Sequence, residues 1–173
     1  MSLRPPVGPA DHAQGPHDAP ITLVEYGDFE CPYCGAAYPQ LKAVQDAMGE
    51  RLRFVFRNFP LTNAHPHAQR AAEFAEAAAM IDRFWEMHDI LYEHQQALDD
   101  KSLVRYAERL GFTPDLIESA LRGDFADKVR QSFSGGVRSG VNGTPCLFIN
   151  GARFDGPAEA ETLIAVFREM LGA

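Results

Sequence analysis

Two short hydrophobic runs near the start of the chain have the composition of β-strands and are separated by a helical pattern. Residues 21–26 are rich in β-branched and aromatic side chains, which predicts a strand. After Pro32, apolar residues recur at every third or fourth position and predict a helix that ends near Gly49. Over residues 52–59, leucine and phenylalanines alternate with arginines and predict a second strand, ended by Pro60. This order predicts a right-handed βαβ unit with parallel strands.

The middle of the chain, about residues 62–140, has few β-branched residues and is rich in Ala, Glu, Leu and Arg. We expect Thr113 and Asp124 to be N-caps within this block, because their side-chain oxygens can accept from the first free backbone N–H groups. The spacing of apolar residues and the positions of Gly, Pro and Asp predict helices near 66–80, 82–94, 100–110, 114–122 and 124–138.

The pattern returns to strands after Pro145. Residues 146–149 are apolar, and Asn150-Gly151 indicates a tight hairpin turn before residues 152–154. A final helix is expected over about 157–171, starting at Pro157. We expect its buried face to contain Leu163, Val166, Phe167 and Met170.

These elements predict an α/β domain over residues 20–173, in which βαβ and ββα units share a central mixed sheet and a helical block is inserted at about 62–140. With 173 residues, of which 46% are hydrophobic, the chain is long enough to bury one core. Residues 1–19 form a proline-rich arm with few large apolar side chains, and we expect this arm to be extended or disordered.

Charge and composition exclude some classes of partner. The chain has 16 Lys plus Arg and 24 Asp plus Glu, a net charge of −8, and its basic residues form no cluster, so no nucleic-acid partner is expected. No apolar run approaches the roughly 20 residues that span a bilayer. The arm lacks the basic start and apolar stretch of a secretory signal. The compartment therefore stays open: periplasmic or otherwise extracytoplasmic if a signal was removed, and cytoplasmic if not.

Cys31 and Cys34 form a C-x-x-C pair at the start of the first predicted helix. Free N–H groups and the helix dipole stabilise a thiolate at Cys31, which is the nucleophile in disulfide exchange. Cys34 lies one turn further on, close enough to resolve a mixed disulfide. Pro32 stiffens the turn and Tyr33 adds an aromatic side chain between the cysteines. This context favours a redox pair over two alternatives, an inert pair and half of a zinc site.

A metal site is disfavoured by the rest of the sequence. A four-ligand zinc site usually has a second C-x-x-C or a spaced histidine pair, whereas here only Cys146 and scattered histidines remain. The histidines at 65, 67, 88 and 94 have no cysteine or carboxylate nearby that completes a ligand set. We expect neither a metal nor an organic cofactor, because the cysteine pair is itself a redox centre.

Two segments resemble the DsbA-like oxidoreductases of the thioredoxin fold: residues 25–34, EYGDFECPYC, and residues 140–145, GVNGTP, continued by LFING at 147–151. The resemblance covers nearly the whole chain from about residue 18. It implies a thioredoxin fold with an inserted helical block and a cis Thr144–Pro145 bond facing the cysteines. It also implies protein thiol or disulfide substrates that pair with the backbone beside Thr144 and Pro145.

The same family commonly has an acidic residue six positions before the first cysteine, where this chain has Glu25. The resemblance implies a buried carboxyl with a raised pKa that relays a proton to or from Cys34. The alternative is a solvent-facing strand residue, because an alternating strand places Glu25 on either face. Cys146 departs from the family pattern of a small residue after the proline. We expect it to be buried and inert, with an alternative disulfide as the other option.

The direction of electron flow stays open at this level. A DsbA-like oxidase and a thioredoxin-like or glutaredoxin-like reductase share this chemistry, and the dipeptide Pro32-Tyr33 also occurs in glutaredoxins, which are shorter and lack the helical block. A third alternative is a non-catalytic thioredoxin-fold binding module. Either enzyme would act with protein substrates and with a redox partner that the sequence does not identify.

Overall fold

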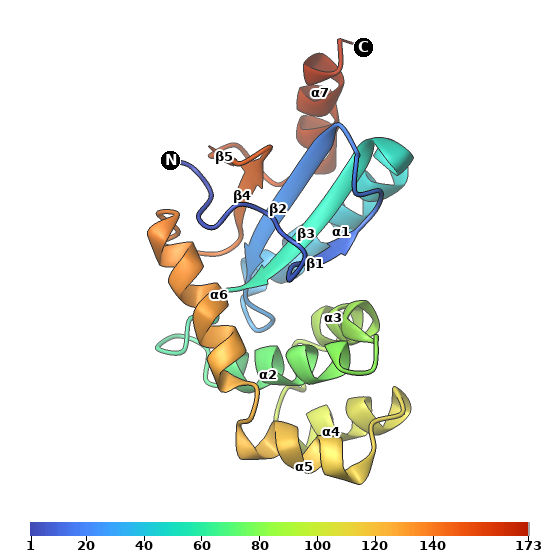
Figure 1. Cartoon of the computed structure of the whole chain (residues 1–173), viewed down its shortest axis with the longest axis vertical. Coiled ribbons are helices and arrows are strands. Elements are labelled where there is room, and N and C mark those ends of the chain that lie inside the picture. Colours follow the sequence, from blue (N-terminus) through green and yellow to red (C-terminus); the bar gives the residue numbers. More distant parts are fainter. Residues whose placement is uncertain (173) are drawn as a thin grey trace.

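A mixed sheet of five strands, in the order β1-β3-β2-β4-β5, forms the centre of the computed structural model, which describes residues 1–172 (Figure 1). The strands β2 and β3 are parallel, and every other neighbouring pair is antiparallel. The predicted βαβ unit and the mixed α/β sheet are therefore confirmed. The strands are β1 (His12–Gln14), β2 (Ile21–Gly27), β3 (Leu52–Asn58), β4 (Cys146–Ile149) and β5 (Ala152–Phe154).

The helices flank this sheet and extend beyond one end of it (Figure 1). The helices α1 and α7 pack on one face, where the predicted apolar stripe of α1 is buried against β2, β3 and β4. The helices α2 to α6 form the inserted block, within two residues of the predicted bounds. The helical elements are α1 (Pro32–Met48), η1 (Gly49–Arg51), α2 (Ala68–Ala79), α3 (Phe84–Glu93), α4 (Asp100–Arg109), α5 (Pro114–Arg122), α6 (Ala126–Arg138) and α7 (Ala160–Met170).

The two N-caps predicted from the sequence have different outcomes. Thr113 caps α5 as predicted, because its hydroxyl accepts from the N–H of Leu116. The prediction for Asp124 is wrong: α6 starts at Ala126 without a side-chain cap. The Asp124 carboxylate is instead held by Arg122 and by the Ser119 hydroxyl, both in the preceding helix.

The last helix also differs from its prediction. It begins at Ala160 rather than at Pro157, and Met170 is exposed. Leu163 and Phe167 are fully buried in the core as expected, and the next position on that face, four residues on, is Leu171. Leu171, rather than Met170, therefore packs on the core.

The N-terminal arm, expected to be extended or disordered, packs on the sheet, and its residues 12–14 are extended as β1. At one edge of the sheet β1 pairs with β3, and at the other Ser2 forms a bridge with Ala152. The buried Leu3 donates its N–H to the carbonyl of Gly151 at 2.9 Å. The arm thus crosses one face of the sheet and covers both of its edges (Figure 1).

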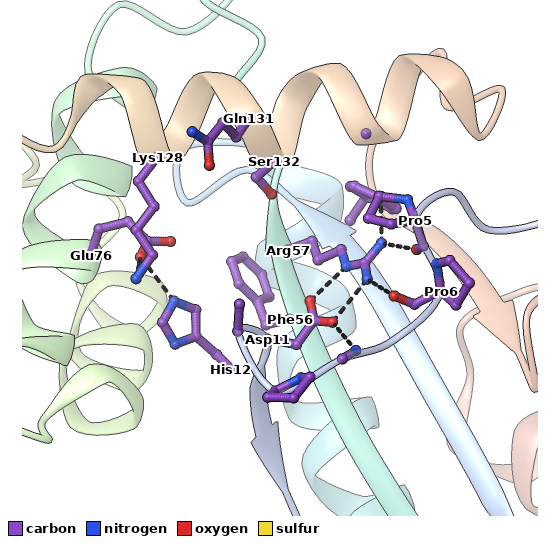
Figure 2. Close-up of a pocket in the computed structure, with 15 residues that line it drawn as sticks. Pro5, Pro6, Asp11, His12, Phe56, Arg57, Glu76, Lys128, Gln131 and Ser132 are labelled. Atoms are coloured by element: carbon purple, nitrogen blue, oxygen red, sulfur yellow. Dashed lines mark hydrogen bonds and ion pairs between the residues drawn. The ribbon is translucent and has the colours of Figure 1, made fainter.

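Arg57 of β3 anchors the arm from beneath. Its Nε and one Nη donate to the two carboxylate oxygens of Asp11 at 2.7 and 2.9 Å. The same guanidinium donates to the carbonyls of Pro5 and Pro6 at 2.9 and 3.2 Å (Figure 2). These contacts border a cavity of about 340 Å³ between the arm, β3 and α6. Because the partners lie 46 to 52 residues apart, no local pattern predicts this anchor.

A second ion pair joins the arm to the helical block. His12 Nε2 lies 2.9 Å from a carboxylate oxygen of Glu76 in α2, and Lys128 of α6 binds the same oxygen at 3.1 Å (Figure 2). The ring of His12 also stacks on Phe84 at a centroid distance of 3.6 Å. The arm is therefore held to both the sheet and the inserted helices.

Candidate active site

Cys31 is the N-cap of α1, with extended backbone angles (φ −69°, ψ 123°) and Pro32 at the first helical position. The missing N–H of proline costs nothing there, because the first N–H groups of a helix have no partner in the helix. Cys34 follows one turn later, so both sulfurs lie at the helix N-terminus. Cys31 is 2% exposed and Cys34 is fully buried, whereas Tyr33 between them is 76% exposed.

The two thiols differ strongly in acidity. A hydrogen bond from the Cys34 thiol, supported by Thr144 and by the backbone N–H groups of Cys34 and Tyr33, lowers the pKa of Cys31 to about 5. Burial raises the pKa of Cys34 well above its usual value, as does that thiol's hydrogen bond to Cys31. At neutral pH one sulfur is therefore a thiolate nucleophile and the other a protonated thiol.

The loop before β4 lies over Cys31. The sulfur of Cys31 is 3.6 Å from the carbonyl oxygen of Thr144, and the Thr144–Pro145 peptide bond is cis. β4 is antiparallel to β2, with Cys146 opposite Tyr26, and this pairing brings the loop to the end of β2 where α1 begins. The two segments that carried the family resemblance are thus in contact, although 113 residues separate Cys31 from Thr144.

Glu25 lies in β2 on the same side of the sheet as α1. It is 2% exposed, and its Oε1 atom has no hydrogen-bond partner within the protein. Burial raises the pKa of Glu25 to about 8, with a smaller contribution from the negative charge at Cys31. Glu25 in turn raises the pKa of Cys34, which shows that the two groups are electrostatically coupled. The carboxyl is therefore a buried acid beside the cysteines, not a solvent-facing strand residue.

Sequence reasoning missed two residues, Asp28 and Gln95, that hold the turn around Cys31. The buried Asp28 accepts from the N–H of Leu61 at 2.9 Å and pairs with His65 Nδ1 at 2.7 Å. The amide of Gln95 donates to the carbonyls of Phe29 and Cys31, both at 2.9 Å. Each pair joins the turn to the inserted segment or to the loop before it. The sequence carries no signal for them, because the partners come together only in the folded chain.

His65 adds a positive partner near the site. Burial lowers the pKa of His65, but the hydrogen bond and charge of Asp28 outweigh that effect and raise it overall, with a further contribution from the charge at Cys31. A protonated His65 favours the thiolate form of Cys31. His65, one of the four histidines considered as metal ligands, is thus paired with a carboxylate.

Cys146 is buried in the core cluster on the opposite face of the sheet, with Phe148 and Val24 among its members. Burial raises the pKa of its thiol. These features fit the expectation of a buried, unreactive cysteine. Within residues 1–172, no group of three His, Cys, Asp or Glu side chains has the arrangement of a metal site. None of the helices in that described part has both the length and the hydropathy to cross a bilayer.

The acidity of Cys31 predicts a pH profile. Alkylation of Cys31 by iodoacetamide is expected to reach half its maximal rate at about pH 5, because only the thiolate reacts and the pKa of Cys31 is lowered to about 5. The thiolate is present above this pH and is lost as the pH falls through it. The measurement is mass spectrometry of the modified peptide over a pH series.

The Cys31→Ser variant is the control for this profile. Cys34 and Cys146 remain in it, and because burial raises the pKa of both thiols, alkylation is expected only at alkaline pH. A wild-type midpoint near 9, the usual pKa of a thiol, would contradict the interpretation.

The fold is similar to that of several solved structures. BdbD from Bacillus subtilis (oxidised) is 22% identical with a TM-score of 0.84, covering 94% of each chain. Wolbachia pipientis alpha-DsbA1 is 19% identical with a TM-score of 0.84, covering 96% of this chain and 93% of that one. A thioredoxin-like oxidoreductase from Silicibacter pomeroyi is 23% identical with a TM-score of 0.82, covering 96% and 95%. These similarities confirm the thioredoxin fold and the resemblance to DsbA-like proteins.

Curated relatives are similar in sequence but much longer. The Na(+)/H(+) antiporter NhaA 3 of Salinispora tropica is 47% identical over 171 residues, covering 95% of this chain and 26% of that protein. The antiporter NhaA of Herminiimonas arsenicoxydans is 40% identical over 172 residues, covering 96% and 27%. This chain thus spans about a quarter of their length. A family model described as thioredoxin matches residues 8–167. The chain therefore belongs to this thioredoxin family.

Proposed function

We propose that this chain is a thiol–disulfide oxidoreductase that exchanges disulfides with protein substrates in the manner of DsbA-like proteins. The observation that carries the proposal is the pair of thiols of opposite acidity at one helix N-terminus. Cys31, with its pKa lowered to about 5, provides the nucleophile, and the protonated Cys34 provides the resolving thiol. The redox centre is the cysteine pair, so the reaction needs no organic cofactor.

In the reductive direction, the Cys31 thiolate attacks a substrate disulfide, forms a mixed disulfide with one substrate sulfur and releases the other as a thiolate. Cys34 then attacks the Cys31 sulfur, forms the Cys31–Cys34 bond and releases the substrate thiolate; the opposite direction reverses these steps. Glu25 takes the proton that Cys34 loses, and returns it when the disulfide opens. The backbone at Thr144 and Pro145, together with Pro32 and the exposed Tyr33, contacts the substrate chain.

The oxidant direction is favoured by the acidity of Cys31. A hydrogen-bonded thiolate stabilises the reduced form of the pair, and this makes the disulfide form a stronger oxidant. An oxidase of this kind regains its disulfide from a redox partner, which the comparisons leave unidentified. The reductase alternative predicts a reduction potential below the glutathione poise, whereas a strongly stabilised thiolate raises the potential of the pair.

Two measurements test the proposal. The wild-type protein is expected to catalyse the refolding of reduced ribonuclease, and equilibration with glutathione buffers is expected to place its reduction potential above the glutathione poise. A potential well below that poise would support the reductase instead. If the protein alkylated at Cys31 and Cys34 keeps its partner binding and the native protein shows no exchange, the chain is a binding module.

A further inference from the structure

A small cavity lies behind Glu25, between the sheet and the helices α1 and α3. It offers about 10 Å³ to a sphere of the size of water, which is about the room that one water molecule needs. Its lining includes Glu25 of β2, His88 of α3, and Tyr38 and Lys42 of α1. The cavity therefore lies between the buried carboxyl of Glu25 and the contact of α1 with α3.

Two buried polar atoms that lack a protein partner belong to side chains lining this cavity. They are Oε1 of Glu25 and Nε2 of His88, which is 3% exposed. A buried polar atom without a hydrogen bond has lost its hydration without compensation, so two such atoms at one cavity indicate a shared partner of water size.

His88 is part of a chain of polar contacts that reaches the surface. Its Nδ1 atom lies 2.8 Å from one carboxylate oxygen of Asp89, and the other oxygen of Asp89 lies 2.7 Å from Lys42 Nζ. Asp89 and Lys42 are both partly exposed. A ring that donates from Nδ1 to Asp89 presents Nε2 to the cavity as an acceptor. Burial keeps His88 neutral, because it lowers the pKa of the ring despite Asp89.

We propose that this cavity holds one water molecule between Glu25 and His88, and that His88 and Asp89 carry the proton of Glu25 to solvent. The inference rests on the proposed function and extends it, because Glu25 has no direct exposure through which to exchange its proton. His88 is a positioning residue: it acts on the cysteines only through the water and Glu25.

Closing of the Cys31–Cys34 disulfide sends one proton from the site to solvent. Glu25 first gives its proton through the water to Nε2 of His88, and the charged ring is stabilised by Asp89. Cys34 then gives its own proton to Glu25 and attacks the Cys31 sulfur. The Cys34–Cys31 bond forms, the bond from Cys31 to the substrate breaks, and the substrate sulfur leaves with the electron pair. The ring finally loses its Nδ1 proton through Asp89 to solvent and keeps on Nε2 the proton that came from Glu25.

Other charged or titratable groups surround the two ends of this path. Glu25 interacts electrostatically with Cys31 and Cys34 of the α1 segment and with Tyr92 of α3. The ring of His88 interacts with Asp89 of α3, Lys42 of α1 and His12 of β1. Asp89 is the only carboxylate among them, and it is in contact with the ring. It therefore stabilises a proton on His88, whereas Lys42 and His12 favour its release.

A single-turnover reaction with dithiobis(nitrobenzoate), which releases a coloured thiolate, isolates the closing of the Cys31–Cys34 disulfide. Cys31 attacks the reagent and releases the first thiolate at a rate proportional to reagent concentration. Cys34 then closes the Cys31–Cys34 disulfide and releases the second coloured thiolate at a rate that does not depend on reagent concentration. In wild type, the second rate is expected to rise with pH and level off above about 8, where Glu25 is already ionised.

The His88→Phe variant keeps an aromatic ring among its neighbours but removes both nitrogens. We expect the second phase to slow about tenfold at neutral pH, with the difference closing above the pKa of Glu25. The first phase should not change. Glu25→Gln should slow the second phase at every pH, and His88→Phe should add nothing in that background, because both residues act on one path. His17→Gln, at an exposed position of the arm, is the matched control and should behave as wild type.

The outcomes separate the two proposals. A second phase that His88→Phe leaves unchanged, or slows equally at every pH, would overturn the proton route and leave disulfide exchange intact. A wild-type protein with no first phase would instead overturn the proposed function. If His88→Phe does not fold, Asp89→Asn carries the test, because it keeps the ring and removes its carboxylate. The same pH-dependent slowing is expected, and its absence contradicts the route.

Discussion

Replacing Cys31 by serine is expected to slow disulfide exchange by more than about a thousandfold, because a hydroxyl cannot provide the nucleophile at neutral pH. The loss is this large because Cys31 is the one thiol with a lowered pKa, whereas burial raises the pKa of both Cys34 and Cys146. Neither of the other cysteines can therefore take over. The measurement is the initial rate of insulin reduction or of ribonuclease refolding.

Two further variants make this result specific. Cys34→Ser should trap the mixed disulfide between Cys31 and the substrate, which is seen as a covalent adduct on a non-reducing gel. Cys146→Ser should keep the wild-type rate, because this thiol is packed in the core on the opposite face of the sheet. Exchange activity that survives Cys31→Ser would refute the assignment of the nucleophile.

Replacing Arg57 by methionine is expected to lower the free energy of unfolding by about 3 kcal/mol or more, because it leaves the Asp11 carboxylate without its partner. Arg57 is 7% exposed and donates to Asp11, to two carbonyls of the arm and to the hydroxyl of Tyr26. Methionine fills the space of the side chain but removes every donor. The measurement is urea unfolding, read as a change in midpoint at constant slope.

The same variant has a predicted pH dependence. Burial raises the pKa of Asp11, but the hydrogen bonds and charge of Arg57 outweigh this and hold it below its usual value. A depressed carboxyl pKa stabilises the fold above the unfolded value, and this stability is lost as the pH falls through the folded value. The difference between wild type and Arg57→Met should therefore shrink in acid. Arg53→Met, on the same strand but nearer solvent, is the control and should cost much less.

The position of the cysteine pair at a helix start was predictable because its signals are local. The C-x-x-C spacing, the proline at the first helical position and the apolar repeat of the following helix all lie within residues 31–48. Thr113 was predictable as an N-cap for the same reason, since its partner is only three residues away. Asp124 carries the same type of signal but is bound by Arg122 and Ser119, which compete for its carboxylate.

The surroundings of the pair required the folded chain. An alternating strand leaves open which face Glu25 occupies, and only the packing of α1 and α3 on the sheet makes it a buried acid. The contacts of Asp28 with His65 and of Gln95 with the Cys31 carbonyl join segments 37 and 64 residues apart. Composition did not predict where the arm lies. Its prolines and few apolar residues suggested an extended or disordered segment, whereas Arg57 and pairing with β3 hold it on the sheet.

The sequence by itself thus determined the order of strands and helices from β2 onward, the C-x-x-C pair and its position at a helix start. These features depend on backbone preferences and on neighbours within one or two turns. Only the tertiary structure decided which polar groups are buried, which of them are paired and where the arm lies. Burial and long-range pairing depend on which distant segments share a surface. The same packing raises the pKa of Glu25 and leaves His88 as its neighbour across the cavity.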